Sequence, residues 1–278
     1  NLDFVENSTS IYDYYPWYYY YKILGNANAI INNVDAATGP DNEKRFLKAQ
    51  ALTFRAFCFF RLSQVYSKRW SDSNNGASRG VVLRLDESTG NMAVSTLAET
   101  YARIYQDLDD ALALYAESKL NRDEDENYAV NADVAHAIYA RAALTREDWA
   151  VAASHAASAR ANYTLMNNAQ YVNGGFNTPN KEWIWSVYSN AQETLYFYQF
   201  FANQGSNSNA ALARNYPCAI SKELYDSIPT TDVRRAMFLN PDTMTFNTSS
   251  GLAGKGMTAY AKRVYKKKLY STSRIYAY

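Results

Sequence analysis

The chain has 278 residues, of which 47% are apolar, so it is long and hydrophobic enough to bury a sizeable core, and extensive disorder is excluded. Its net charge of +1 gives no reason to expect nucleic acid or an anionic membrane surface as a partner. The sequence has no apolar run of the roughly 18 residues that a membrane-spanning helix needs.

Two long helices are predicted near the start of the chain, over residues 17–35 and 42–66. Between them, residues 36–40 end in Gly-Pro, which is typical of a helix stop. Asp41 or Asn42 is expected to cap the second helix. Apolar residues cover more than one stripe of this second helix, so it must be buried on most sides. These residues are Phe46, Ala49, Leu52, Phe54, Ala56, Phe57, Phe60, Leu62 and Val65.

Three further helices are predicted after a polar loop at residues 71–78. Residues 81–85 could form a short extended segment before the next helix, which covers residues 97–116. Residues 131–144 and 147–161 then form a helical hairpin. Hairpins of this length, with alanine at the points of close packing, are typical of tetratricopeptide-like units, although the usual repeat signature is degenerate here.

The character of the sequence changes after residue 161. Turn-forming Asn, Gly and Pro residues become frequent, and the long helical patterns stop. We therefore predict an N-terminal tetratricopeptide-like helical region, residues 1–161, and an irregular region, residues 162–278. The predicted fold class is mostly α, with tetratricopeptide-like helical hairpins and an irregular, aromatic-rich insert.

Several segments, taken in order, resemble the SusD/RagB family of outer-membrane nutrient-binding lipoproteins. Residues Lys44–Tyr66 are similar to that family's run E-x-x-x-x-x-A-E-A-x-x-x-R-A-x-x-Y-F-x-L, with Gln50 in place of a glutamate and Phe59 in place of a tyrosine. Each matching segment alone is a soft motif, but their order along the chain is fairly specific. The other segments are Tyr18–Val34, Leu97–Leu114, Asn131–Ala161, Glu182–Ser186 and Thr231–Arg235.

The resemblance implies a function as well as a SusD-like fold. A protein of this kind is a lipid-anchored lipoprotein on the extracellular face of the outer membrane of a Gram-negative bacterium. It captures an oligosaccharide without making or breaking a bond, and it delivers this ligand to a SusC-like TonB-dependent transporter. The N-terminal lipid anchor is not present in this chain. Family members continue into further helices from the point where the sequence stops, so we expect an incomplete helical layer at the C-terminal side.

Aromatic residues are unusually frequent, with 25 tyrosines, and their rings can stack on the apolar C–H faces of a sugar. Tyr14, Tyr15 and Trp17 surround Pro16, which we expect to end any regular element before the first helix. The resemblance implies that one part of an aromatic arc lies near this point and that another part comes from the later region. The ligand-binding residues predicted there are Tyr188, Tyr196, Tyr198 and Tyr216.

No catalytic residue, metal site or cofactor is predicted. His136 and His155 stand on alanine-rich helices without Cys or carboxylate partners at a zinc spacing, which favours structural roles. Residues 123–127 offer oxygens at alternating positions, as a calcium loop would, but Tyr128 stands where an EF-hand needs glycine. A solvated acidic turn is the better interpretation of this stretch.

Two alternative functions stay open at this point, and the cysteines favour neither. Cys58 and Cys218 are far apart in the sequence and indicate neither a disulfide framework nor a metal site, and Cys58 is expected to be a buried structural thiol. One alternative is a peptide-binding member of the SusD/RagB-like family. The other is a glycoside hydrolase that uses a pair of carboxylates with no distinctive sequence context.

Overall fold

A computed structural model of the chain describes residues 10–172, 179–186 and 222–238. The mostly α fold is confirmed, and this part of the chain contains no β-strand. Its long helices are α1 (Ile11–Asn33), α2 (Asp41–Tyr66), α3 (Leu97–Ser118), α4 (Ala132–Thr145) and α5 (Trp149–Arg160). The short elements are η2 (Val34–Ala36), η3 (Trp70–Asp72), α6 (Asn168–Val172), α9 (Lys222–Ser227) and η5 (Val233–Met237).

The described residues belong to two compact units. Residues 10–165 and 181–186 form the first unit, which contains all five long helices. Residues 166–172, 179–180 and 222–238 belong to the second unit, with α6, α9 and η5. The candidate functional site described below lies entirely within the first unit.

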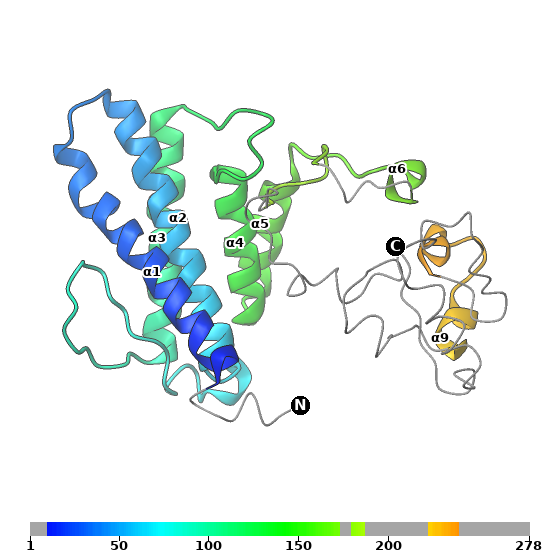
Figure 1. The fold of residues 1–278 in the computed structure, drawn as a ribbon, viewed down its shortest axis with the longest axis horizontal. Helices are drawn as coiled ribbons and strands as arrows, with labels where there is room; N and C mark the ends of the chain where they lie inside the picture. Colours follow the sequence, from blue (N-terminus) through cyan, green and yellow to red (C-terminus); the bar gives the residue numbers. More distant parts are fainter. Residues whose placement is uncertain (1–9, 173–178, 187–221, 239–278) are drawn as a thin grey trace, which may run out of the picture. The chain divides into compact units, whose positions relative to one another are not determined.

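Helix α2 is the centre of the first unit. It packs against α1 on one side and α3 on the other, while α4 packs against α3 and α5 packs against α4 (Figure 1). The prediction that α2 is buried on most sides is confirmed, since Ala49, Leu52, Ala56 and Leu62 are all buried. The sequence pattern was wrong for Val65, which is 49% exposed at the end of the helix.

The beginnings of α1 and α2 differ from the predictions. Helix α1 starts at Ile11 and runs through Pro16, so Pro16 does not end an element before the helix as we expected. Helix α2 is preceded by Pro40 at its N-cap, without a side-chain cap, and Asp41 is its first residue rather than a cap. Asp41 instead pairs with Lys44 one turn later, and this hydrogen bond lowers the pKa of the Asp41 carboxyl.

The other long helices start and end close to the predicted residues because local signals fix them. Thr96 and Glu99 form a capping box at the start of α3, in which each side chain accepts a hydrogen bond from the other residue's backbone N–H. Helix α3 ends at Lys119 in the left-handed conformation, with φ of 57°. Asn131 caps α4 by accepting from the N–H of Val134 at 3.1 Å.

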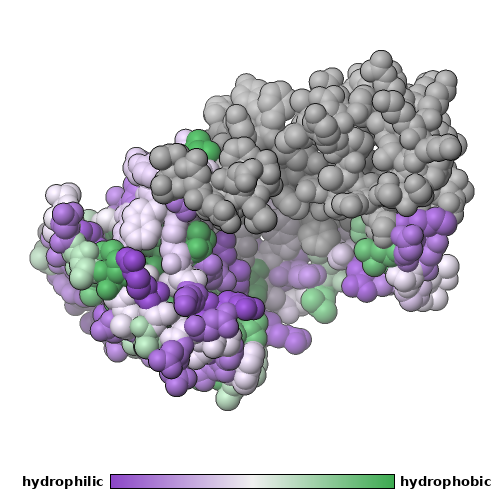
Figure 2. All heavy atoms as spheres, turned by 90° about the horizontal axis from the view of Figure 1, so that it is seen from below, coloured by the Kyte–Doolittle hydropathy of each residue, from purple (hydrophilic) through white to green (hydrophobic). Residues whose placement is uncertain are grey.

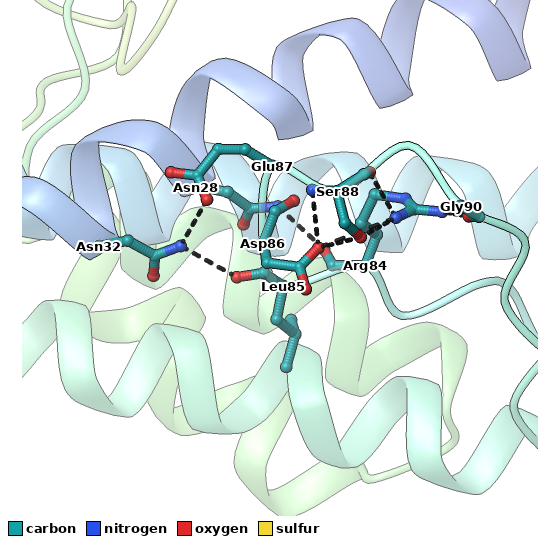
Figure 3. A network of polar contacts seen from close by, with 8 residues as sticks. All are labelled: Asn28, Asn32, Arg84, Leu85, Asp86, Glu87, Ser88 and Gly90. Atoms are coloured by element: carbon teal, nitrogen blue, oxygen red, sulfur yellow. Dashed lines mark hydrogen bonds and ion pairs between the residues drawn. The ribbon is translucent and has the colours of Figure 1, made fainter.

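The loop before α3 runs along α1 as a strap, and it is bonded to the buried Asn28 and to Tyr21. Residues 81–85 form no strand, but their carbonyl groups are held by asparagine side chains of α1 (Figure 3). The Asn28 amide donates to the carbonyls of Arg84 at 3.0 Å and Asp86 at 3.1 Å, and Asn32 donates to Leu85. The Arg84 guanidinium then closes the loop by bonding to Ser88 and Gly90.

A buried polar chain joins α1, α2 and α3 through the middle of the core. Arg55 of α2 donates twice to the Asp107 carboxylate of α3, at 2.9 and 2.7 Å, and once to Asn28 of α1 at 3.1 Å. Arg103 of α3 also bonds to Asp107, whose side chain is fully buried. Burial raises the pKa of Asp107, while hydrogen bonds and charge from the two guanidinium groups oppose this change.

Candidate functional site

The first three turns of α1 carry a dense group of aromatic side chains, which the helix divides between two faces. Trp17, Tyr20 and Tyr21 face the rest of the unit and pack against its core. The Trp17 indole contacts the Tyr21 ring at a centroid distance of 4.6 Å, and Tyr20 contacts Phe57 of α2 edge-on at 6.1 Å. These three rings therefore anchor the start of the helix rather than offer a free surface.

The opposite face of the same turns presents four tyrosines to solvent. Tyr14, Tyr15, Tyr18 and Tyr19 are 54%, 43%, 44% and 55% exposed. We call these four residues the tyrosine ladder. Large apolar ring faces left in water at neighbouring positions mark a surface that a ligand or partner covers.

The ladder rings contact one another in two pairs along the helix. Tyr14 and Tyr18 stack with ring centroids 5.7 Å apart at 21°, and Tyr15 and Tyr19 lie 5.5 Å apart at 42°. Each pair is separated by four residues, the spacing that places side chains above one another on a helix. Tyr18 and Tyr19 also meet edge-on at 5.8 Å, so the two pairs form one continuous aromatic surface.

Lys22 brings a positive charge to the ladder. The ammonium group of Lys22 lies over the Tyr18 ring at 6.0 Å from its centroid, one turn further along α1. Figure 2 views the molecule from below, from the side where α1 begins. Hydrophilic and intermediate residues cover most of the coloured surface there, and the hydrophobic patches are small and separate. Rings, hydroxyl groups and one cation give this surface the means to stack on a ligand and to bond to its polar groups.

The structure separates the predicted ligand-binding residues. Tyr14 and Tyr15 are exposed members of the ladder, whereas Trp17 is partly buried on the opposite face. Tyr18 and Tyr19 were not predicted, although their four-residue spacing from Tyr14 and Tyr15 is a signal that a helix starting at Ile11 would have revealed. The remaining predicted residues lie outside the described residues: Tyr188, Tyr196, Tyr198 and Tyr216.

A family model of starch-binding proteins that associate with the outer membrane matches residues 2–144, just over half of the chain. The chain belongs to this SusD-like family. The resemblance read from the sequence is thereby confirmed, and the SusD-like family is one of saccharide-binding, outer-membrane-associated proteins rather than enzymes. A comparison with curated proteins finds no match.

Solved structures share the SusD-like fold. A putative sugar binding protein from Bacteroides vulgatus is 24% identical with a TM-score of 0.62, and the match covers 73% of this chain and 50% of that one. A SusD-like carbohydrate binding protein from the same species is 23% identical with a TM-score of 0.67, covering 80% of this chain and 46% of that one. A SusD superfamily protein from Bacteroides thetaiotaomicron is 20% identical with a TM-score of 0.65, covering 84% and 51%. The SusD-like chain thus spans no more than 51% of the length of these proteins.

Two ionisable groups with raised pKa values, Asp107 and Cys58, belong to the core of this SusD-like protein. Asp107 is enclosed by two arginines, and burial raises the pKa of the Cys58 thiol to about 12. Neither side chain reaches solvent, so neither can touch a substrate. In the part of the chain that the structure describes, no three His, Cys, Asp or Glu side chains gather as metal ligands would. The helices in that part are also too short or too polar to cross a membrane.

The two histidines of this SusD-like protein meet between α4 and α5. Their Nδ1 atoms lie 2.8 Å apart, so one ring donates a hydrogen bond to the other. The His155 ring also stacks on Tyr139 at a centroid distance of 3.8 Å. Burial lowers the pKa of both rings, and His155 lowers that of His136 further, while the carboxylates of Asp133 and Asp109 oppose the change for His136 and His155 respectively.

This pair makes the stability of the first unit fall in acid. A histidine whose pKa is lower in the folded state takes up its proton first in the unfolded chain, so stability is complete above the ordinary pKa of about 6.5 and is lost as the pH falls below it. We expect the melting temperature to drop between about pH 7.5 and 5.5. In the double variant His136→Gln/His155→Gln the drop should be smaller, and equal drops in both proteins would contradict the role of the pair.

Proposed function

We propose that this SusD-like chain captures oligosaccharides on its tyrosine ladder and delivers them to a SusC-like TonB-dependent transporter. It would work as a lipid-anchored protein on the extracellular face of the outer membrane. The observation that carries the proposal is the pair of tyrosine rows, Tyr14 stacked on Tyr18 and Tyr15 in tilted contact with Tyr19, which are exposed on one helix.

The chemistry of a sugar chain suits this surface. A pyranose has an apolar C–H face, which a flat ring can cover, and a rim of hydroxyl groups, which tyrosine hydroxyls and nearby polar groups can satisfy. Because the anchoring face of α1 is packed against the core, the exposed rings are held in place before a ligand arrives. A preorganised site loses less conformational entropy on binding, which favours capture by a shallow surface.

The second part of the proposed site lies in the region of residues 162–278. We propose that Tyr188, Tyr196, Tyr198 and Tyr216 contribute to it and that the helical region, residues 1–161, provides the rigid support. No bond is made or broken in this function, so binding strength is the quantity to measure. A shallow and hydrated site of this kind implies modest affinity.

A panel of soluble polysaccharides tests the proposal. Native gel electrophoresis of the full chain in gels that contain soluble starch, other α-glucans or β-glucans should show retardation by at least one of them. A pool of peptides, tested by calorimetry, forms the comparison arm. Retardation by no polysaccharide together with heat release on adding peptides would contradict the glycan proposal and favour a peptide ligand. The appearance of new reducing ends at a rate typical of enzymes would contradict a role limited to binding.

Removal of two ladder rings should weaken binding strongly. The double variant Tyr14→Ala/Tyr18→Ala loses a whole stacked row, and at about 1 kcal/mol for each ring its affinity should fall roughly 30-fold. Tyr128→Ala is the matched control, because Tyr128 is similarly exposed, at 51%, but lies outside α1. Both variants should keep the helical circular dichroism signal. Equal affinity of the ladder variant and wild type would exclude the ladder from the binding site.

A further inference from the structure

Helix α1 contains a proline in its second turn, and a side chain from α2 bridges the backbone beside it. In a regular helix each N–H donates to the carbonyl four residues earlier. Pro16 has no N–H to donate, and its ring crowds the carbonyl four residues earlier, so one backbone hydrogen bond is lost. The next position along the helix is the one at which the Trp17 N–H faces the Asp13 carbonyl. The Tyr66 hydroxyl accepts from the Trp17 N–H at 2.9 Å and donates to the Asp13 carbonyl. It therefore joins these two backbone groups.

Tyr66 is well placed to hold this point. It is the last residue of α2, three residues after Ser63, which is buried together with Phe60 and Leu62. Its ring packs edge-on against the Trp17 indole, with centroids 5.1 Å apart at 85°. Burial raises the pKa of the Tyr66 hydroxyl, so the group keeps the proton that it donates. The start of α1 is thus fastened to the end of the most buried helix of the unit.

Both ring pairs of the tyrosine ladder span the proline. Tyr14 precedes Pro16 and its partner Tyr18 follows it, and the same is true of Tyr15 and Tyr19. The distance between the rings of each pair therefore depends on the helix geometry at the residue where a backbone bond is missing. A hydroxyl group that bridges residues 13 and 17 controls that geometry.

We infer that Tyr66 is a positioning residue, which sets the spacing of the ladder rings and thereby their affinity for a sugar chain. This inference rests on the proposed function of the ladder. Tyr66 is only partly exposed and contacts the inner, anchoring face of α1, so it acts on the ligand through the helix and not by direct contact. The hydroxyl group, rather than the ring, is the part that performs this role.

The variant Tyr66→Phe tests the inference because it keeps the ring on Trp17 and removes only the bridging oxygen. Affinity for the panel polysaccharide that wild type binds most tightly, beginning with soluble starch, should fall roughly three- to tenfold, as for the loss of one hydrogen bond. A second measurement needs no ligand. Amide hydrogen exchange at Trp17, followed by NMR, should become faster, because its N–H loses the Tyr66 acceptor.

The matched control is Tyr115→Phe. Tyr115 also has a buried hydroxyl, which lies 3.3 Å from the Thr53 hydroxyl between α2 and α3, away from the start of α1. Its removal should leave both the affinity and the Trp17 exchange rate unchanged. A loss of affinity in both tyrosine variants would indicate general destabilisation and would overturn a specific role for Tyr66.

The ladder variant separates the inference from the proposal beneath it. If Tyr14→Ala/Tyr18→Ala loses binding while Tyr66→Phe binds and exchanges like wild type, the positioning role is overturned and the glycan site stands. If the ladder variant binds like wild type, the proposed site fails, and the positioning role fails with it. Weaker binding in both, with faster exchange at Trp17 in Tyr66→Phe, supports both statements.

Discussion

The variant Asp107→Ala will lose about 3–5 kcal/mol of unfolding free energy, since it removes one partner of a buried ion pair. The Asp107 side chain is fully buried and accepts hydrogen bonds from Arg55 and Arg103. Without the carboxylate, the Arg55 guanidinium keeps only the hydrogen bond to Asn28, and its charge stays in the core without a counter-charge. Urea unfolding followed by far-ultraviolet circular dichroism measures the loss.

A neighbouring carboxylate provides the control for this prediction. Asp110 stands one turn further along α3 and lies 3.9 Å from Arg103, but its side chain is 48% exposed. The variant Asp110→Ala should change stability by at most about 1 kcal/mol, as for other ion pairs in contact with water. A similar loss in both variants would show that burial of the pair is not what makes Asp107 important.

Helices with local start and stop signals are the part of this fold that the sequence predicts well. The ends of α3 and α4 lie within two residues of their predicted positions, because Thr96, Glu99 and Asn131 supply caps within one turn of the helix start. The general burial of α2 follows from its apolar pattern in the same way. Each of these predictions depends on residues close together in the chain.

The start of α1 could not be predicted from neighbouring residues. Proline in a helix interior removes a backbone hydrogen bond, so the local pattern favours a break at Pro16. The helix continues across Pro16, where the Tyr66 hydroxyl, from a residue 49 positions away from Trp17, bridges the Trp17 N–H and the Asp13 carbonyl beside the lost bond. A contact between distant residues overrides the local rule here.

The same misjudged boundary explains the errors in the candidate site. With Tyr14 and Tyr15 placed before the helix and Trp17 at its first residue, helix phase does not distinguish the three rings from one another. In a helix that begins at Ile11, the 100° turn per residue sends Trp17 to the side opposite the ladder. Tyr18 and Tyr19 then join the exposed face, as the structure shows. The composition pointed to the correct segment, but helix phase decides which rings reach a ligand.

The variant Phe59→Ala is expected to lose about 3–5 kcal/mol of unfolding free energy, the usual range for a large buried aromatic side chain. Phe59 of α2 is fully buried within the core cluster, so the truncated side chain leaves a cavity that the close-packed helices on either side cannot fill. The loss should appear as a lower urea midpoint with an unchanged slope, because the same surface is exposed on unfolding.

Phe57, two residues earlier on the same helix, is the matched control. It is only partly buried, and its ring makes edge contacts with Tyr20 and Trp185 at centroid distances of 6.1 and 5.1 Å. The variant Phe57→Ala should therefore lose only about 1–2 kcal/mol, from partial burial and aromatic contacts. The apolar pattern of the sequence predicted burial of Phe57 and not of Phe59, whereas the structure buries Phe59 more deeply. The variant that loses more unfolding free energy therefore shows which of the two is correct. If Phe57→Ala loses more unfolding free energy than Phe59→Ala, then the side of α2 that carries Phe59 is not the tightly packed one.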